Sequence, residues 1–91
     1  MAHVIVTVQI MPSSPEVNLD HIKAIALPMI AKFGAQPAKE EVVPIAFGIK
    51  ALKLFLIMDE SKGGTDRLEA DLGKIAGVES VNVIDVRRTL G

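Results

Sequence analysis

Two histidines are the only imidazole side chains in this 91-residue chain, and no cysteine is present. Asp20 precedes His21, but neighbouring residues on a helix point about 100° apart, so the pair indicates a solvated first turn rather than an acid–base pair. His3 lies far away, in a strand-like segment. Glu40 and Glu41 alternate across a strand and cannot converge on one substrate atom. The sequence therefore predicts no enzymatic activity, no bound cofactor and no metal site.

A glycine pair is the one feature that could hold a phosphate. The segment Gly63-Gly64-Thr65 precedes a predicted helix, whose first backbone N–H groups attract anions. However, the chain contains neither a G-x-x-x-x-G-K-[ST] nor a G-x-G-x-x-G string. We interpret the segment as a flexible turn with a helix cap, and nucleotide binding there is the less favoured alternative.

Charge and aromatic content argue against direct nucleic-acid binding. Ten basic and eleven acidic side chains give a net charge of −1, which does not suit a bulk polyanion binder. The chain has three phenylalanines but no tyrosine or tryptophan, so it lacks the aromatic platform on which RNA-recognition sheets stack bases. We expect no direct contact with nucleic acid.

The length fits one domain, residues 1–91. The longest apolar run, residues 54–58, is far shorter than the roughly 20 residues of a membrane span. The first eleven residues alternate between apolar and polar types instead of forming the continuous apolar run of a signal peptide. We therefore expect a soluble protein without a membrane partner, and the absence of cysteine fits a reducing, cytoplasmic location.

Hydrophobic periodicity predicts six elements. Alternating or continuous β-prone patterns predict strands over residues 2–11, 36–45, 51–58 and 78–86, followed by a polar tail. Helical spacing predicts one helix from Asn18 to Phe33, closed by Gly34, and a second from Thr65 to Ala76, closed by Gly77.

Prolines refine these predictions. Pro28 inside the first helix predicts a kink or a break, because it removes a hydrogen bond and crowds the carbonyl of Ala24. Pro37 and Pro44 predict that residues 36–45 form an edge strand. The uninterrupted strand at residues 51–58 should be central.

The order β-α-β-β-α-β is that of the split βαβ arrangement. Right-handed crossovers place both helices on one face of a four-stranded antiparallel sheet, which gives an α+β, ferredoxin-like, two-layer sandwich. The uncovered sheet face is mixed, since Ile5, Phe55 and Ile57 accompany polar residues. Whether that face meets a partner or a second copy, or is simply solvated, stays open.

Two segments resemble a known family. Residues 44–54 read Pro-Ile-Ala-Phe-Gly-Ile-Lys-Ala-Leu-Lys-Leu, and residues 78–83 read Val-Glu-Ser-Val-Asn-Val. The first string is similar to the signature of the guanine-nucleotide-exchange domain of elongation factor one beta, and the second is similar to the last strand of that family. The opening strand, the turn into the first helix and the length resemble the archaeal form.

The resemblance implies a protein that binds the GTPase elongation factor one alpha and speeds the release of GDP without covalent chemistry. It implies that Phe47, before the third strand, inserts into the GTPase. It also implies that a basic residue near the carboxyl end approaches the magnesium site of the GTPase. Arg88 matches that position, with Arg87 as the second choice.

The residues themselves leave alternatives open. Gly48 permits a tight bend that would position Phe47, yet the phenylalanine could instead plug the end of the core. Lys50 suits either an acidic partner surface or a solvated strand face, and Arg87 and Arg88 could be a solubilising tail. An exchange factor should be active as a monomer, whereas the alternative function, a small-molecule-binding regulatory domain, should act as a dimer.

Overall fold

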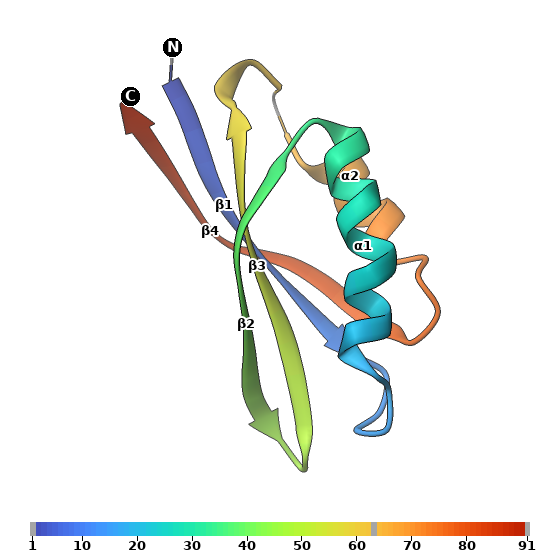
Figure 1. The fold of residues 1–91 in the computed structure, drawn as a ribbon. Helices are drawn as coiled ribbons and strands as arrows, with labels where there is room; N and C mark the ends of the chain where they lie inside the picture. Colours follow the sequence, from blue (N-terminus) through green and yellow to red (C-terminus); the bar gives the residue numbers. More distant parts are fainter. Residues whose placement is uncertain (1, 63, 91) are drawn as a thin grey trace.

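The computed structural model describes residues 2–62 and 64–90. Four strands form one antiparallel sheet in the order β2-β3-β1-β4, and two helices cover one face of it (Figure 1). The elements are β1 (Ala2–Pro12), α1 (Leu19–Phe33), β2 (Gln36–Ala46), β3 (Ile49–Asp59), a 3₁₀ turn η1 (Glu60–Lys62), α2 (Asp66–Leu72) and β4 (Val78–Leu90). The predicted ferredoxin-like α+β fold is confirmed.

The core lies between the helices and the sheet. Alternate residues of the two central strands point into it, because successive side chains of a strand face opposite sides. The fully enclosed members from the strands and helices include Val8, Ile10, Leu54, Leu56, Ile22, Ile30, Leu68 and Leu72. The predicted central position of β3 is confirmed, as is the predicted inward face of that strand.

Helix α1 begins and ends as the sequence predicts. The side chain of Asn18 accepts a hydrogen bond from the backbone N–H of Asp20 at 2.9 Å, and Gly34 adopts the left-handed conformation with φ of 105°. The predicted break at Pro28 is wrong, since the helix continues to Phe33. Both Pro28 and Ala24 are exposed, so the carbonyl that lacks its usual donor faces solvent and can bond to water.

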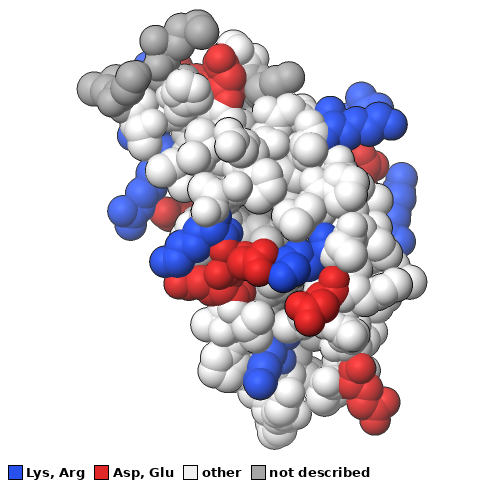
Figure 2. All heavy atoms as spheres, viewed as in Figure 1, with Lys and Arg blue, Asp and Glu red and all other residues white. Residues whose placement is uncertain are grey.

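Strand β2 lies at an edge of the sheet, as its prolines predict. It pairs only with β3, and Lys23 of α1 ties it to the helical layer through an ion pair with Glu40 at 2.7 Å. The hydrogen bond to Glu40 raises the pKa of Lys23 above its ordinary value, so this lysine stays charged. Pairs of this kind form a band of mixed charge across the middle of the molecule in Figure 2.

The second helix is shorter than predicted. Helix α2 ends at Leu72, whereas the apolar stripe suggested that it continues to Ala76. Thr65 occupies the N-cap position, but its hydroxyl bonds to the carboxylate of Glu69 at 3.1 Å instead of capping a backbone N–H. Helix α2 is seven residues long, and the carboxyl half of β4 extends beyond both helices (Figure 1).

Strand β4 is longer than predicted. It continues beyond Val86 to Leu90, so the predicted polar tail at residues 87–90 is part of the sheet. Residue 91, the end of the predicted tail, lies outside the described residues. No helix in the described part of the chain is both long and apolar enough to cross a membrane.

Candidate partner-binding site

The turn between β2 and β3 presents Phe47. Ala46 pairs with Ile49, so Phe47 and Gly48 alone form the loop, and both have positive φ angles, of 52° and 79°. This combination is typical of a type I′ turn, whose twist matches that of the flanking strands. A phenylalanine rarely adopts a left-handed conformation, and such strain often marks a functional residue.

The phenyl group of Phe47 projects into solvent. The residue is 97% exposed, so the interpretation that it plugs the core is wrong. Ile45, two residues before it, is 45% exposed. Figure 2 shows that this end of the molecule, where the turn lies in Figure 1, carries few charged side chains. The turn therefore offers an apolar contact surface of the kind that anchors protein interfaces.

Gly48 and Lys50 lie beside the phenylalanine. Together with Pro12, Pro15, Val17 and Leu19 they line a small groove of about 220 Å³ between the turn and the loop after β1. Lys50 is exposed and forms no ion pair with the described side chains. The predicted site residues Phe47, Gly48 and Lys50 are thus brought together at one end of the sheet.

Replacing Gly48 by alanine is expected to destabilise the protein by about 1–2 kcal/mol, because an L-residue at φ of 79° is strained. Space is not the cause, since the nearest atom to an added Cβ would be Cβ of Pro15 at 4.0 Å. Gly64→Ala is the matched control, with similar space and no positive φ. Urea unfolding measures the stability of both variants. Equal destabilisation by Gly48→Ala and Gly64→Ala would contradict the explanation by backbone strain.

Arg87 and Arg88 lie at the opposite end of the sheet. On β1, Arg87 pairs with Ile5 and Arg88 pairs with Val4, whereas the turn lies beyond Leu52, the partner of Ile10. Strand β3 runs between the two ends, and its 11 residues span about 35 Å at about 3.3 Å per residue. The structure therefore does not bring the arginines close to Phe47, and a partner that contacts both groups must span most of the molecule.

The two arginines point to opposite faces of β4, as neighbours on a strand do. Arg87 lies on the open sheet face, where its Nε is 2.9 Å from a carboxylate oxygen of Asp85. Arg88 lies on the helix side, where it forms an ion pair with Glu60 of η1 and donates a hydrogen bond from Nη2 at 3.1 Å. Each guanidinium is thus already paired with a carboxylate of its own chain.

Two exposed apolar residues beside the arginines were missed by sequence reasoning. Ile84 is 47% exposed and Val86 is 59% exposed. Ile84 follows Val83, which pairs with the buried Val8, so Ile84 faces the open side of the sheet. Val86 pairs with the buried Val6 on the helix side, but the helices do not cover it. The pattern holds no signal for this exposure, because it depends on which part of the sheet the helices cover.

The turn that presents Glu60 depends on Asp59. Its carboxylate accepts a hydrogen bond from the backbone N–H of Ser61 at 2.9 Å, and this bond lowers the pKa of Asp59 below its ordinary value of 3.8. A lowered pKa in the folded state contributes stability above pH 3.8, which is lost as the pH falls through the folded value.

Below pH 3.8, the free energy of unfolding of Asp59→Asn should fall less steeply with pH than that of the unsubstituted chain. The reason is that the variant has no carboxylate to protonate at this position. Urea unfolding above and below that pH measures the slope. Asp66→Asn controls for the change in net charge. An unchanged acid slope in Asp59→Asn, relative to the unsubstituted chain, would contradict the expectation.

Nothing in the described part of the chain groups three or more side chains suited to holding a metal ion. The candidate site thus consists of an apolar turn at one end and a basic, partly apolar strand at the other. Exposed apolar and basic groups of this kind are suited to contact with a partner protein. Comparison with known proteins gives the family.

The sequence profile of the EF-1 guanine nucleotide exchange domain matches residues 5–89. The chain belongs to this family. Members of the exchange-domain family named "Elongation factor 1-beta" match over almost their whole length. The protein of Methanobrevibacter smithii is 42% identical, over 99% of this chain and 100% of the relative. That of Hyperthermus butylicus is also 42% identical, over 97% of this chain and 96% of the relative.

A third relative, "Elongation factor 1-beta" of Methanothermobacter thermautotrophicus, is 37% identical over 99% of this chain and all of its own. Among solved structures, the C-terminal domain of the MgtC protein from Mycobacterium tuberculosis is similar, with a TM-score of 0.59. That alignment covers 98% of this chain and 87% of the other at 17% identity, so it shows a shared fold alone. The family match over residues 5–89 confirms the resemblance of residues 44–54 to the exchange-domain family.

Proposed function

We propose that this chain is a guanine nucleotide exchange factor that binds the GTPase elongation factor one alpha and promotes the release of GDP and the reloading of GTP during peptide elongation. The observation that carries the proposal is Phe47, an almost fully exposed phenylalanine held in a left-handed turn, in a chain that belongs to the exchange-domain family. The protein acts by binding and not by covalent chemistry.

The exchange mechanism is one of differential binding. A GTPase holds GDP through backbone donors, a P-loop lysine and Mg²⁺. A protein that binds best to a conformation in which these contacts are broken shifts the population toward that conformation and so lowers the affinity for GDP. In this proposal, the apolar end of the sheet contributes to binding the GTPase, and the basic end contributes to the release of the nucleotide.

The apolar end supplies affinity. Phe47 and the exposed Ile45 provide a compact surface that an apolar depression of the GTPase can enclose, with Lys50 at its margin. A large aromatic group buried at the centre of an interface typically contributes most of the binding free energy. In this proposal the turn is the anchor of the complex.

The basic end supplies the effect on nucleotide. Arg88 approaches the metal and phosphate site of the GTPase, supported by the exposed Val86 and Ile84 on the same strand. A guanidinium binds a carboxylate or phosphate through two parallel hydrogen bonds, so Arg88 competes for ligands that otherwise serve Mg²⁺ and GDP. To do so it must leave Glu60, and an exposed pair of this kind is worth only about 1 kcal/mol or less.

Other parts of the proposal concern how the protein works in the cell. The chain acts as one domain of residues 1–91, as a monomer, and in the cytoplasm where translation takes place. Neither the family match nor the curated relatives favour the alternative, a dimeric regulatory domain that binds a small molecule. Analytical ultracentrifugation tests the monomer directly.

The test of function is release of a fluorescent GDP from the cognate elongation factor one alpha, with excess unlabelled nucleotide and increasing amounts of this protein. Faster release at substoichiometric amounts is expected, because an exchange factor turns over. No acceleration with a verified GDP-loaded partner would overturn the proposal.

A further inference from the structure

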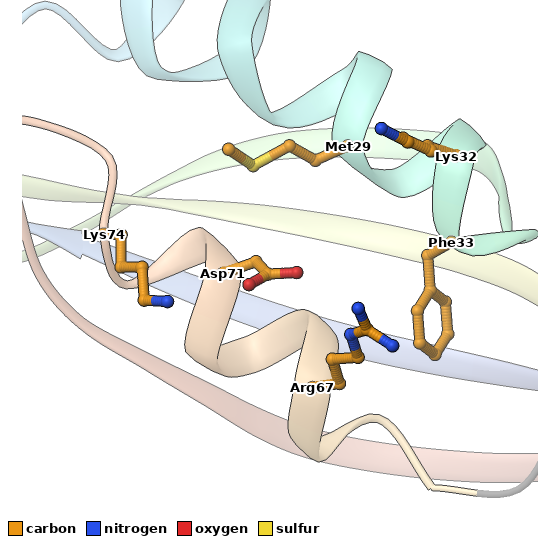
Figure 3. A pocket seen from close by; sticks show the side chains of 6 residues that line it. All are labelled: Met29, Lys32, Phe33, Arg67, Asp71 and Lys74. Carbon is orange, nitrogen blue, oxygen red and sulfur yellow. The ribbon is translucent and has the colours of Figure 1, made fainter.

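A groove separates the two helices on the side of the molecule opposite the open sheet face. Its volume is about 600 Å³, within the range of about 300–1,000 Å³ that is typical of small-molecule sites. One wall comes from the last turns of α1, and the other comes from α2 and from Lys74 in the turn after it. The residues that line it are Met29, Lys32, Phe33, Arg67, Asp71 and Lys74 (Figure 3).

The basic side chains of the groove are unusual in this protein because they are unpaired. Elsewhere in the described chain, Lys23, Lys39, Lys53, Arg87 and Arg88 each form an ion pair. The described basic side chains without such a pair are Lys32, Lys50, Arg67 and Lys74, and three of these four line the groove.

The groove therefore concentrates positive charge in a chain whose net charge is −1. With Asp71 as the single acidic residue, its lining side chains sum to about +2. Like charges along one groove repel one another, and a bound anion lowers this repulsion. An anionic ligand would relieve this repulsion and would find cations on both walls.

The apolar part of the groove has its own chemistry. Met29 and Phe33 are half-buried and pack against the core, so their positions are fixed and their outer surfaces remain accessible. Figure 3 shows the ring of Phe33 extending from α1 toward α2 and Arg67 extending toward that ring, while Asp71 lies between Arg67 and Lys74. A planar ring placed here would contact an aromatic face and a thioether, both of which favour aromatic partners.

We propose that this groove binds a nucleoside phosphate. The phosphate would pair with Arg67, which can bind it through two hydrogen bonds, and the positive charges of Lys32 and Lys74 along the groove would attract it. The ring would lie against Phe33 and Met29. Asp71 would accept a hydrogen bond from a hydroxyl or amino group of the ligand, which explains a carboxylate among cations. Inorganic phosphate lacks this combination of ring, donors and charge.

The experiment is a titration of the full-length, ¹⁵N-labelled chain with ADP and, separately, with inorganic pyrophosphate, at fixed ionic strength and without divalent cations. Saturable shifts of amide signals in the last turns of α1 and in α2 are expected with ADP. Pyrophosphate should bind at least fivefold more weakly, because it has no ring. No saturable shift with ADP, or equal binding of both probes, would overturn the proposal.

Variants locate the site. Arg67→Gln combined with Lys74→Gln should weaken ADP binding at least tenfold, whereas Lys39→Gln, which removes a positive charge from the edge of the sheet, should change it less than twofold. Phe33→Leu keeps an apolar contact with the core and should weaken ADP about fivefold without affecting pyrophosphate. Unchanged ADP binding in the double variant, or an equal loss of ADP binding in Lys39→Gln, would overturn the assignment.

GDP exchange on the GTPase is measured separately from ADP binding to the groove. The proposed exchange function and the proposed nucleoside phosphate site can therefore fail independently.

Discussion

Replacing Phe47 by alanine is expected to reduce the catalytic efficiency of GDP release from elongation factor one alpha by about thirtyfold or more, with no loss of stability. The loss follows because truncating an aromatic anchor at the centre of an interface costs about 2 kcal/mol or more. Stability should not fall, because the phenyl group is 97% exposed and contributes nothing to the core. Stopped-flow release of fluorescent GDP and urea unfolding measure the two quantities.

Phe47→Gly sharpens this test because it changes function and stability in opposite directions. Glycine adopts φ of 52° without a steric penalty, whereas an L-residue there stores about 1–2 kcal/mol of strain. After the extra conformational entropy of glycine in the unfolded chain is subtracted, the variant should be as stable as the unsubstituted chain or about 1 kcal/mol more stable. Its exchange activity should be as low as that of Phe47→Ala.

A different result would identify the role of the residue. If Phe47→Ala exchanges nucleotide at the normal rate, the turn is not the anchor. If it loses stability in proportion to activity, the phenylalanine supports the hairpin rather than the partner. Ala24→Gly is a useful reference for stability, since it alters an exposed helical position far from both ends of the sheet.

Replacing Arg88 by alanine is expected to slow catalysed GDP release about tenfold to a hundredfold while weakening the complex with nucleotide-free GTPase less than fivefold. Hydrogen bonds to charged groups contribute about 1.5–3 kcal/mol, and in this proposal they form mainly in the state that expels nucleotide. Release kinetics give the first quantity, and calorimetry with the nucleotide-free GTPase gives the second. Equal losses in both would make Arg88 an ordinary contact.

Neighbouring substitutions separate charge from position. Arg87→Ala removes the same charge from the opposite face of β4, so a smaller effect than that of Arg88→Ala is expected. Arg67→Ala removes an arginine from the helical layer and should leave release unchanged. Glu60→Gln keeps Arg88 but weakens its intramolecular pair, so release should be as fast as in the unsubstituted chain or up to about fivefold faster. Equal effects of Arg87→Ala and Arg88→Ala would show that only net charge matters.

The sequence by itself determined the elements and their order. Asn18 and Gly34 set the ends of α1 through local hydrogen bonding and backbone conformation, which need no tertiary partner. Pro37 and Pro44 determined that β2 lies at an edge, since they cannot donate to a second neighbour. The candidate residues from Phe47 to Lys50 were recognisable because the contiguous segment 44–54 resembles the exchange-domain family.

Tertiary structure decided which of these features are exposed and how far apart they lie. Whether Phe47 is core or surface depends on where the hairpin ends relative to the helical layer, which no local pattern records. Val86 pairs with the buried Val6 but is itself 59% exposed, because β4 is the outer strand and the helices do not cover it there. The turn and Arg88 are separated by the length of β3. Strand β3 leads away from the turn, and antiparallel pairing through β1 places Arg88 beside the far end of β3.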